Sequence, residues 1–219
     1  MIMHEISAQI NALHNLGVLH AKMPFNLFTK LSDHIDSLSD NAEPYNHKLL
    51  GHIKEEYSLD NEKDMVSEFI EAMAVSYEQA HPGYSESFEE AAKSNGKYKL
   101  YLDTLWVNKQ KKYEFNPVHH HAGVLSFVIW VKIPYDLNEE EKYFPTTSLK
   151  TESHTSKFCF VYTDILGRIQ HAALPVDKTW EGSIIMFPAK LHHCVYPFYT
   201  SDDYRISVSG NIRIKTTVS

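Results

Sequence analysis

The residue pattern that decides the fold begins at residues 98–107, YKLYLDTLWV. From this point β-branched and aromatic residues dominate, and Gly and Pro punctuate the chain. No helical periodicity separates the apolar runs, so we expect strands over 98–107, 113–119, 123–133, 156–163, 167–174, 182–187, 191–197 and 204–215. Eight short strands in succession are typical of a β-sandwich or jelly roll.

The remainder of the chain is expected to support this β-rich half. A length of 219 residues suits one domain, with a mainly helical part over 1–97 and a jelly-roll core over 98–215. The fold class is therefore α+β, mainly β with N-terminal helices. The elements predicted in the first part are a short strand over 17–23 and helices over 25–38, 61–80 and 85–94. The polar residues 137–156 are expected to form a long loop over one mouth of the barrel.

Composition narrows the classes of function. The formal net charge of -7 counts against a general nucleic-acid or membrane-surface binder, which needs a basic surface. No apolar run approaches the roughly 18 residues of a membrane span, and residues 1–5, MIMHE, lack the pattern of a signal peptide. Two cysteines, Cys159 and Cys194, are too few for a disulfide framework. We expect the protein to reside in a reducing cytoplasm, which is that of the host if the protein is viral.

Five of the 14 histidines fall in two tight groups, residues 119–121 and residues 192–193. In a strand, side chains two residues apart point to the same face, so His119 and His121 share a face and His120 points away. Two imidazoles at this spacing can reach one metal ion. The alternative interpretation is a surface histidine run.

The second group offers a third ligand on a distant strand. It follows the apolar run of residues 182–188, GSIIMFP, and alternation turns His193 away from His192. A single histidine in such a strand is more often a structural residue. Together with His119 and His121, however, His193 is a candidate metal ligand.

The last predicted strand carries polar side chains along one face. In residues 204–212, YRISVSGNI, alternate positions hold Arg, Ser, Ser and Asn. Arg205 offers a planar, permanently charged fork that binds a carboxylate bidentately, and Ser207 can add a hydroxyl donor. If this face lies inside the barrel, an unpaired guanidinium there is costly, and we expect an anion beside it. The alternative is a strand with one solvated face.

These residues resemble the site of the 2-oxoglutarate and Fe(II)-dependent oxygenases, which have a His-x-Asp/Glu…His metal triad and a downstream Arg. More narrowly, a set of motifs resembles an oxygenase group common in marine phages and bacteria. The motifs are Trp106-Val107-Asn108, Asn116-Pro117-x-His119-x-His121, Leu125-Ser126, Phe187-Pro188, Leu191-x-His193-x-Val195 and Arg205-Ile206-Ser207. The resemblance spans residues 105–212.

The resemblance implies a double-stranded β-helix with one Fe(II) ion and 2-oxoglutarate. The implied metal ligands, which are also the catalytic residues, are His119, His121 and His193. The implied cosubstrate-binding residues are Arg205, Ser207 and Asn108. The implied activity is that of a dioxygenase, which couples oxidative decarboxylation of 2-oxoglutarate by oxygen to oxidation, expected to be hydroxylation, of an unidentified substrate.

One position departs from the family pattern, because His121 stands where most members have a carboxylate. Three neutral imidazoles leave the site one unit more positive than the usual triad. His121 either ligates the metal, as in three-histidine dioxygenases of the cupin type, or lies behind a position left open for water or halide. We expect ligation, because neutral imidazole suits iron and alternation places His121 beside His119.

Two other interpretations remain open on the sequence. In the first, the chain is a three-histidine cupin-type dioxygenase without 2-oxoglutarate, and Arg205 binds a substrate carboxylate. In the second, it is a non-enzymatic jelly-roll module whose histidines hold a structural metal such as zinc, with Cys194 as a fourth ligand that alternation turns away. The sequence does not indicate the substrate, the oligomeric state or the outcome of the oxidation.

Overall fold

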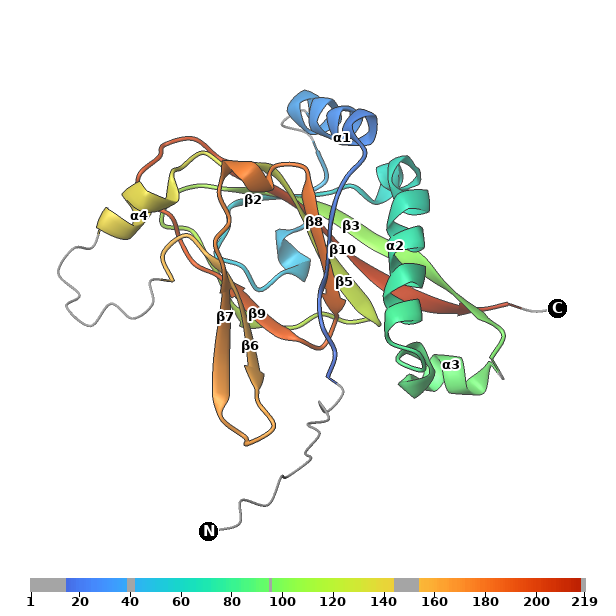
Figure 1. Ribbon diagram of the computed structural model, residues 1–219. Helices are drawn as coiled ribbons and strands as arrows, with labels where there is room; N and C mark the ends of the chain where they lie inside the picture. The colour runs from blue at the N-terminus through green and yellow to red at the C-terminus, as the bar shows by residue number, and fades with distance from the viewer. Residues whose placement is uncertain (1–14, 39–41, 95, 144–153, 218–219) are drawn as a thin grey trace, which may run out of the picture.

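The computed structural model describes residues 15–38, 42–94, 96–143 and 154–217. Two antiparallel β-sheets make up the centre of the described part, and Figure 1 shows the helices α1 and α2 outside them. Their inner faces pack together through aromatic residues, among which Phe158 and Phe160 of the smaller sheet meet Phe187 of the larger one. Among the described helices, none combines the length and apolar character needed to cross a bilayer.

The larger sheet has six strands in the order β1-β8-β5-β10-β3-β2. These strands are β1 (Leu19–Lys22), β8 (Ser183–Pro188), β5 (Leu125–Lys132), β10 (Arg205–Thr216), β3 (Tyr98–Gln110) and β2 (Glu55–Ser58). The smaller sheet has the order β4-β9-β6-β7. Its strands are β4 (Asn116–His119), β9 (His192–Val195), β6 (Phe158–Thr163) and β7 (Ile169–Leu174).

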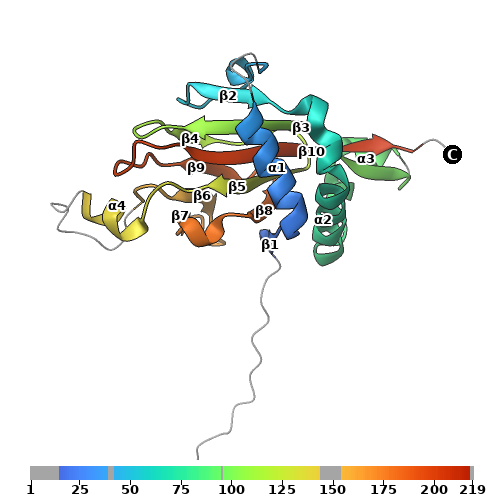
Figure 2. The ribbon, with the colours of Figure 1, turned by 90° about the horizontal axis from the view of Figure 1, so that it is seen from above.

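Alternation along β10 separates the core from the site. The side chains of Ile206, Val208 and Ile212 enter a hydrophobic cluster together with residues of the helices. Those helices are α1 (Phe25–Ser37) and α2 (Ser67–Ala80), which Figure 2 shows lying across the larger sheet. The polar residues between them line a cavity on the opposite face. One strand therefore anchors the core with one face and builds the site with the other.

The eight predicted strands are all present, with ends shifted by a few residues. The short strand expected near residues 17–23 is also present as β1, and the first predicted helix is α1. The second helix begins later than expected, at Ser67, after a 3-10 turn over Asp60–Met65. The third is a 3-10 turn at Ser85–Ser87 followed by α3 (Glu89–Lys93).

Two expectations need correction. The part over 1–97, expected to be a mainly helical support, also completes the β core, because β1 and β2 form the two edges of the larger sheet. The segment 137–156, expected to be a loop, starts with α4 (Leu137–Tyr143), and its residues 144–153 lie outside the described part. Asp136 caps the start of this helix by accepting from the N–H groups of Asn138 and Glu139, and buried Glu140 anchors the helix through hydrogen bonds from the backbone of Tyr199 and Thr200.

Gly210, in the middle of β10, provides a test of the sheet packing. A Cβ at this position would lie 2.5 Å from the Thr104 carbonyl oxygen and 2.6 Å from a ring carbon of Phe127. We expect Gly210→Ala to lower the free energy of unfolding by about 1–3 kcal/mol, as measured by urea denaturation. Gly17→Ala is the control, because its Cβ would meet only His81, at 3.9 Å. Equal stability of the Gly210→Ala variant and the wild type would contradict this packing.

Candidate active site

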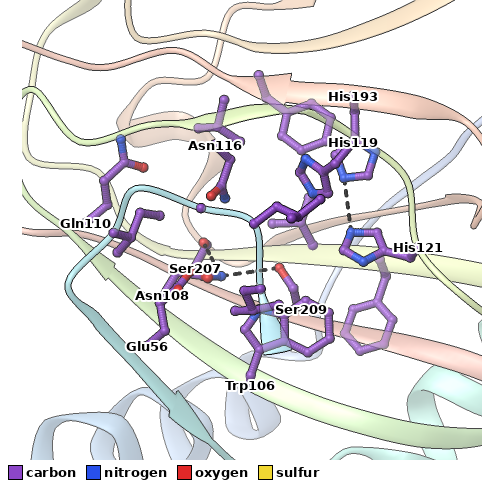
Figure 3. Close-up of a pocket in the computed structure, with 18 of the residues that line it drawn as sticks. Glu56, Trp106, Asn108, Gln110, Asn116, His119, His121, His193, Ser207 and Ser209 are labelled. Carbon is purple, nitrogen blue, oxygen red and sulfur yellow. Dashed lines mark hydrogen bonds between the residues drawn. The ribbon is translucent and has the colours of Figure 1, made fainter. Parts of the chain in front are cut away.

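The three predicted histidines come together where the edge strand β4 of the smaller sheet pairs with β9. β4 pairs with β9 so that His119 lies directly opposite His193. His121 follows β4, where its backbone N–H donates to the Ala189 carbonyl at 2.8 Å. The ring centroids are 4.3 Å apart for His119 and His193, and 5.0 Å apart for each of the other two pairs. Figure 3 shows the three rings pointing into one cavity.

The spacing of the ring nitrogens fits a shared metal ion. The candidate ligand atoms of the three histidines all lie within 4.8 Å of one another, and the Nε2 atoms of His121 and His193 are 3.1 Å apart. Two nitrogens bound at about 2.1 Å on adjacent corners of an octahedron are separated by about 3.0 Å. The observed Nε2 separation, which is also a hydrogen-bond distance, fits two ligands on one ion.

Backbone carbonyls fix the orientation of two of the rings. His119 Nδ1 lies 2.7 Å from the carbonyl oxygen of Pro117, and His193 Nδ1 lies 2.9 Å from that of Leu191. Since a carbonyl can only accept, Nδ1 carries the proton in both neutral rings. The lone pair of each Nε2 is then directed into the cavity, as metal-binding histidines require.

All three imidazoles are held in the neutral form. Burial lowers the pKa of His119, and it lowers that of His193 well below the usual value. Burial also lowers the pKa of His121 to about 3, with a further contribution from the neighbouring His119. Neutral imidazole is the form that binds iron, so the donor set fits an Fe(II) ion without prior loss of protons.

The neighbouring histidines point away, as alternation predicts. His120 and His192 are exposed, and their rings stack edge to face at 5.1 Å on the other side of the strands. Neither belongs to the metal-binding group that the described residues form. His120 thus belongs to the same segment and borders the cavity, but its side chain is exposed, which makes it a useful control.

The floor of the cavity is a row of polar side chains from three neighbouring strands. Ser207 of β10 lies opposite Asn108 of β3, which in turn lies opposite Glu56 of β2. Figure 3 shows these side chains side by side below the histidines, with Asn108 hydrogen-bonded to Ser207 and Ser209. The predicted cosubstrate residues Asn108, Ser207 and Arg205 thus all line the same cavity as the three histidines.

Arg205 is buried, at 4% exposure, but it does not lack partners. Its N–H groups donate to Gln110 Oε1 twice, at 3.1 and 2.6 Å, and once each to the Tyr135 hydroxyl and to the carbonyl oxygens of Ser156 and Tyr196. All five donors of the guanidinium are therefore used. The expectation that burial alone demands an anion is wrong, because neutral oxygens satisfy every donor.

The charge of Arg205 nevertheless stays without a counterion. None of its five contacts is a carboxylate, and no acidic residue pairs with it among the ion pairs of the described chain. A buried positive charge surrounded by neutral dipoles favours an anion in the adjacent cavity.

Glu56 is the site residue that the sequence analysis missed. Its side chain is 1% exposed and lines the cavity, and burial raises the pKa of its carboxyl to about 7, with Glu114 adding to the rise. In the sequence it is the second residue of EEYS, a short polar run that resembles a solvated turn. The signal that would reveal it is the pairing of β2 with β3, which only the fold provides.

Fold and site together describe a protein built on antiparallel sheets, with three convergent histidines that could hold a metal ion. Residues 104–211 match the family described as "Putative 2OG-Fe(II) oxygenase", and this part of the chain belongs to the 2-oxoglutarate and Fe(II)-dependent oxygenases. This family uses Fe(II) and 2-oxoglutarate, and the three-histidine group fits an iron site. The grouping with marine phages stays a prediction.

A solved structure shares the fold. A prolyl-4-hydroxylase from Pseudomonas putida has a TM-score of 0.51 and 13% identity, over 90% of this chain and 92% of that one. A prolyl hydroxylase from Trichoplax adhaerens, solved with a hypoxia inducible factor peptide, has a TM-score of 0.49 and 8% identity, over 92% and 84%.

A 2OG-Fe(II) oxygenase family protein from Burkholderia pseudomallei has a TM-score of 0.37 and 16% identity over 52% of this chain. The match spans only 45% of that protein. No curated protein matches the sequence.

The raised pKa of Glu56 predicts how stability depends on pH. The folded protein holds the proton up to about pH 7, whereas the unfolded chain releases it near 4.5, so this contribution to stability is lost as pH rises between these values. From pH 5.5 to 8 the loss is roughly 2 kcal/mol. We therefore expect the free energy of unfolding of Glu56→Gln, relative to that of the metal-free wild type, to rise by about that amount between pH 5.5 and 8. The measurement is urea denaturation at both pH values.

Taking the difference between variant and wild type cancels the titration of the histidines, which both proteins share. A difference in unfolding free energy that does not change with pH would show that the Glu56 carboxyl ionises normally.

Proposed function

We propose that this protein is a 2-oxoglutarate-dependent dioxygenase whose two sheets form a double-stranded β-helix around one Fe(II) ion. The proposed metal ligands are His119, His121 and His193. The observation that carries the proposal is the convergence of their ring nitrogens in a cavity that also contains the uncompensated charge of Arg205. A metal at one side and a cation at the other match a cosubstrate with a 2-oxo acid end and a distant carboxylate.

The cosubstrate carboxylate is expected to replace the amide of Gln110 at Arg205. Gln110 Oε1 alone accepts from both Nε and Nη2 of Arg205, the two groups to which a carboxylate can bind with one oxygen each. Because a charged acceptor binds a guanidinium more strongly than a neutral one, exchange is favourable once 2-oxoglutarate enters. Ser207 and Asn108, on the floor beside this fork, can donate to the same ligand.

The residues of the chain position and shield the reactants. When bound, Fe(II), 2-oxoglutarate and oxygen supply the oxidising chemistry, with succinate and carbon dioxide as products. The hydrogen bonds to Pro117 and Leu191 hold two imidazoles in the ligating orientation. Phe158 and Phe187 pack against His193 and exclude water from that side, which strengthens the electrostatic interactions in the site.

The third histidine leaves a second candidate function open. With His121 in place of a carboxylate, the metal site is one unit more positive, and a three-histidine dioxygenase that uses no 2-oxoglutarate shares this donor set. In that function Arg205 would bind a carboxylate of the substrate itself. Formation of succinate distinguishes the two, since only the 2-oxoglutarate-dependent reaction produces it.

The metal ligands can be tested against a matched neighbour. We expect His119→Ala, His121→Ala and His193→Ala each to lose tight Fe(II) binding, because two imidazoles remain for the ion. His120→Ala should bind Fe(II) like the wild type, since His120 is exposed on the other side of the strand. The measurement is anaerobic calorimetric titration of Fe(II) into each purified protein.

Normal Fe(II) affinity in His121→Ala would remove that residue from the ligand set and favour the open position. Loss of affinity in His120→Ala as well would show that the strand, not the ligand, is disturbed.

The role of Arg205 predicts a selective loss of cosubstrate binding. We expect Arg205→Ala to retain Fe(II) but to weaken 2-oxoglutarate binding by several hundred-fold, since losing one partner of a buried charged pair costs roughly 3–5 kcal/mol. Arg205→Lys should recover only part of the 2-oxoglutarate affinity, because a lysine offers a point charge instead of a planar fork. The measurement is titration of 2-oxoglutarate into the anaerobic Fe(II) protein, followed by its visible charge-transfer band.

Arg213→Ala is the control, because Arg213 lies on the same strand, half-exposed, and pairs with Asp103. Retained Fe(II) affinity in Arg205→Ala separates a lost cosubstrate contact from misfolding. Equal 2-oxoglutarate affinity in wild type and Arg205→Ala would overturn the assignment, and no binding to the wild type would favour the second candidate function.

A further inference from the structure

The carboxyl group of Glu56 lies in the cavity with one oxygen unpartnered. Its Oε2 accepts a hydrogen bond of 3.2 Å from Asn46 Nδ2, whereas its Oε1 is buried and has no hydrogen-bond partner among the residues that the structure describes. Leaving a buried acceptor unsatisfied is costly, and for a charged group the cost is larger. Such an atom in a ligand cavity indicates a donor that the ligand supplies.

A second unpartnered acceptor lies beside it. Asn108, directly opposite Glu56 in the sheet, has a buried Oδ1 without a partner, and Asn211 on the same inner face has another. The cosubstrates of the proposed function cannot satisfy these atoms, because ionised 2-oxoglutarate and oxygen carry no hydrogen-bond donors. In the loaded site, where a substrate displaces water, donors on the substrate are the groups that can satisfy these atoms.

No cation of the described chain neutralises Glu56. Lys48 is the one lysine among the described residues that line the cavity, and its Nζ lies over the ring of Tyr45, 4.6 Å from the centroid. The nearby Glu114 adds a like charge, which raises the pKa of Glu56 further. A buried carboxylate without a cation gains most from a positively charged partner.

Glu56 lies on a different part of the cavity wall from Arg205. β2 is an edge strand of the larger sheet, and the preceding segment, Leu49–Ile53, lines the cavity. A Cβ on Gly51 would lie 2.0 Å from the Asn116 amide oxygen, so this segment is pressed against β4 and forms part of the wall. Arg205 belongs instead to the inner strand β10, which leaves the β2 edge for the second reactant.

We propose that the substrate carries a protonated amino group, which Glu56 Oε1 binds with Asn108 Oδ1 as the second acceptor. This inference rests on the proposed function and names its substrate class, a primary amine. An ammonium group has three N–H donors and one positive charge, and it therefore satisfies both orphaned oxygens and neutralises the carboxylate. The amine belongs either to a lysine side chain of a peptide or to a small free molecule.

Matched probes test this class of substrate. The protein, loaded with Mn(II) and 2-oxoglutarate at pH 8, is titrated calorimetrically with n-pentylamine and with Nα-acetyl-lysine methylamide. Their neutral counterparts are n-pentanol and Nα-acetyl-norleucine methylamide. We expect at least one amine to bind ten-fold or more tightly than its counterpart. Tighter binding of n-pentylamine would indicate a small free amine, and tighter binding of the lysine derivative would indicate a peptide substrate. Equal binding of amine and counterpart, or no binding of either amine, would overturn the proposal.

Variants assign the effect to Glu56. Glu56→Gln should reduce amine binding to the level of the neutral probe, whereas Lys48→Met should bind the amine as the wild type does. Amine binding that survives in Glu56→Gln would overturn the proposal. Because Gln has the shape of Glu, unchanged Mn(II) and 2-oxoglutarate affinities in the variant verify its fold.

The two proposals fail separately. If the wild type binds neither the metal nor 2-oxoglutarate, the proposed function is contradicted. The amine titration repeated on the metal-free protein would still report on Glu56.

Discussion

The pairing of β4 with β9 is the interaction on which the rest of the site depends. It places His119 opposite His193, although 74 positions separate them in the chain, and the backbone bond from His121 to Ala189 adds the third ring. Each ring is then largely shielded from water, which keeps it neutral, and two are oriented by the backbone carbonyls of Pro117 and Leu191. A metal site thus follows from strand register, because a shift by one residue would turn these side chains to the other face.

The larger sheet supplies the polar half of the cavity, and its charges are arranged asymmetrically. Arg205 stands on an inner strand with all of its donors satisfied by neutral oxygens, whereas Glu56 stands on the edge strand with one oxygen unpartnered. The first group therefore favours an anion and the second a cation. Two reactants of opposite charge would be directed to different parts of one cavity, beside the same three histidines.

Much of this arrangement could be predicted from the sequence. Alternation in the strands identified the polar face of β10 and separated His119 and His121 from His120, because a period of two is a local property of the chain. The partners of Arg205 could not be predicted in this way, since they come from β3, from the segments after β5 and β9, and from Ser156. Glu56 was missed for the same reason, because a charged residue in a short polar run becomes a buried site residue only through sheet pairing.

The most direct test of the account is a crystal structure of the protein with Mn(II) and 2-oxoglutarate. The account predicts that Nε2 of His119, His121 and His193 all lie within about 2.0–2.3 Å of the metal. It also predicts that the far carboxylate of 2-oxoglutarate replaces Gln110 at Arg205. A metal bound by only two of the histidines, or a cosubstrate carboxylate remote from Arg205, would contradict it.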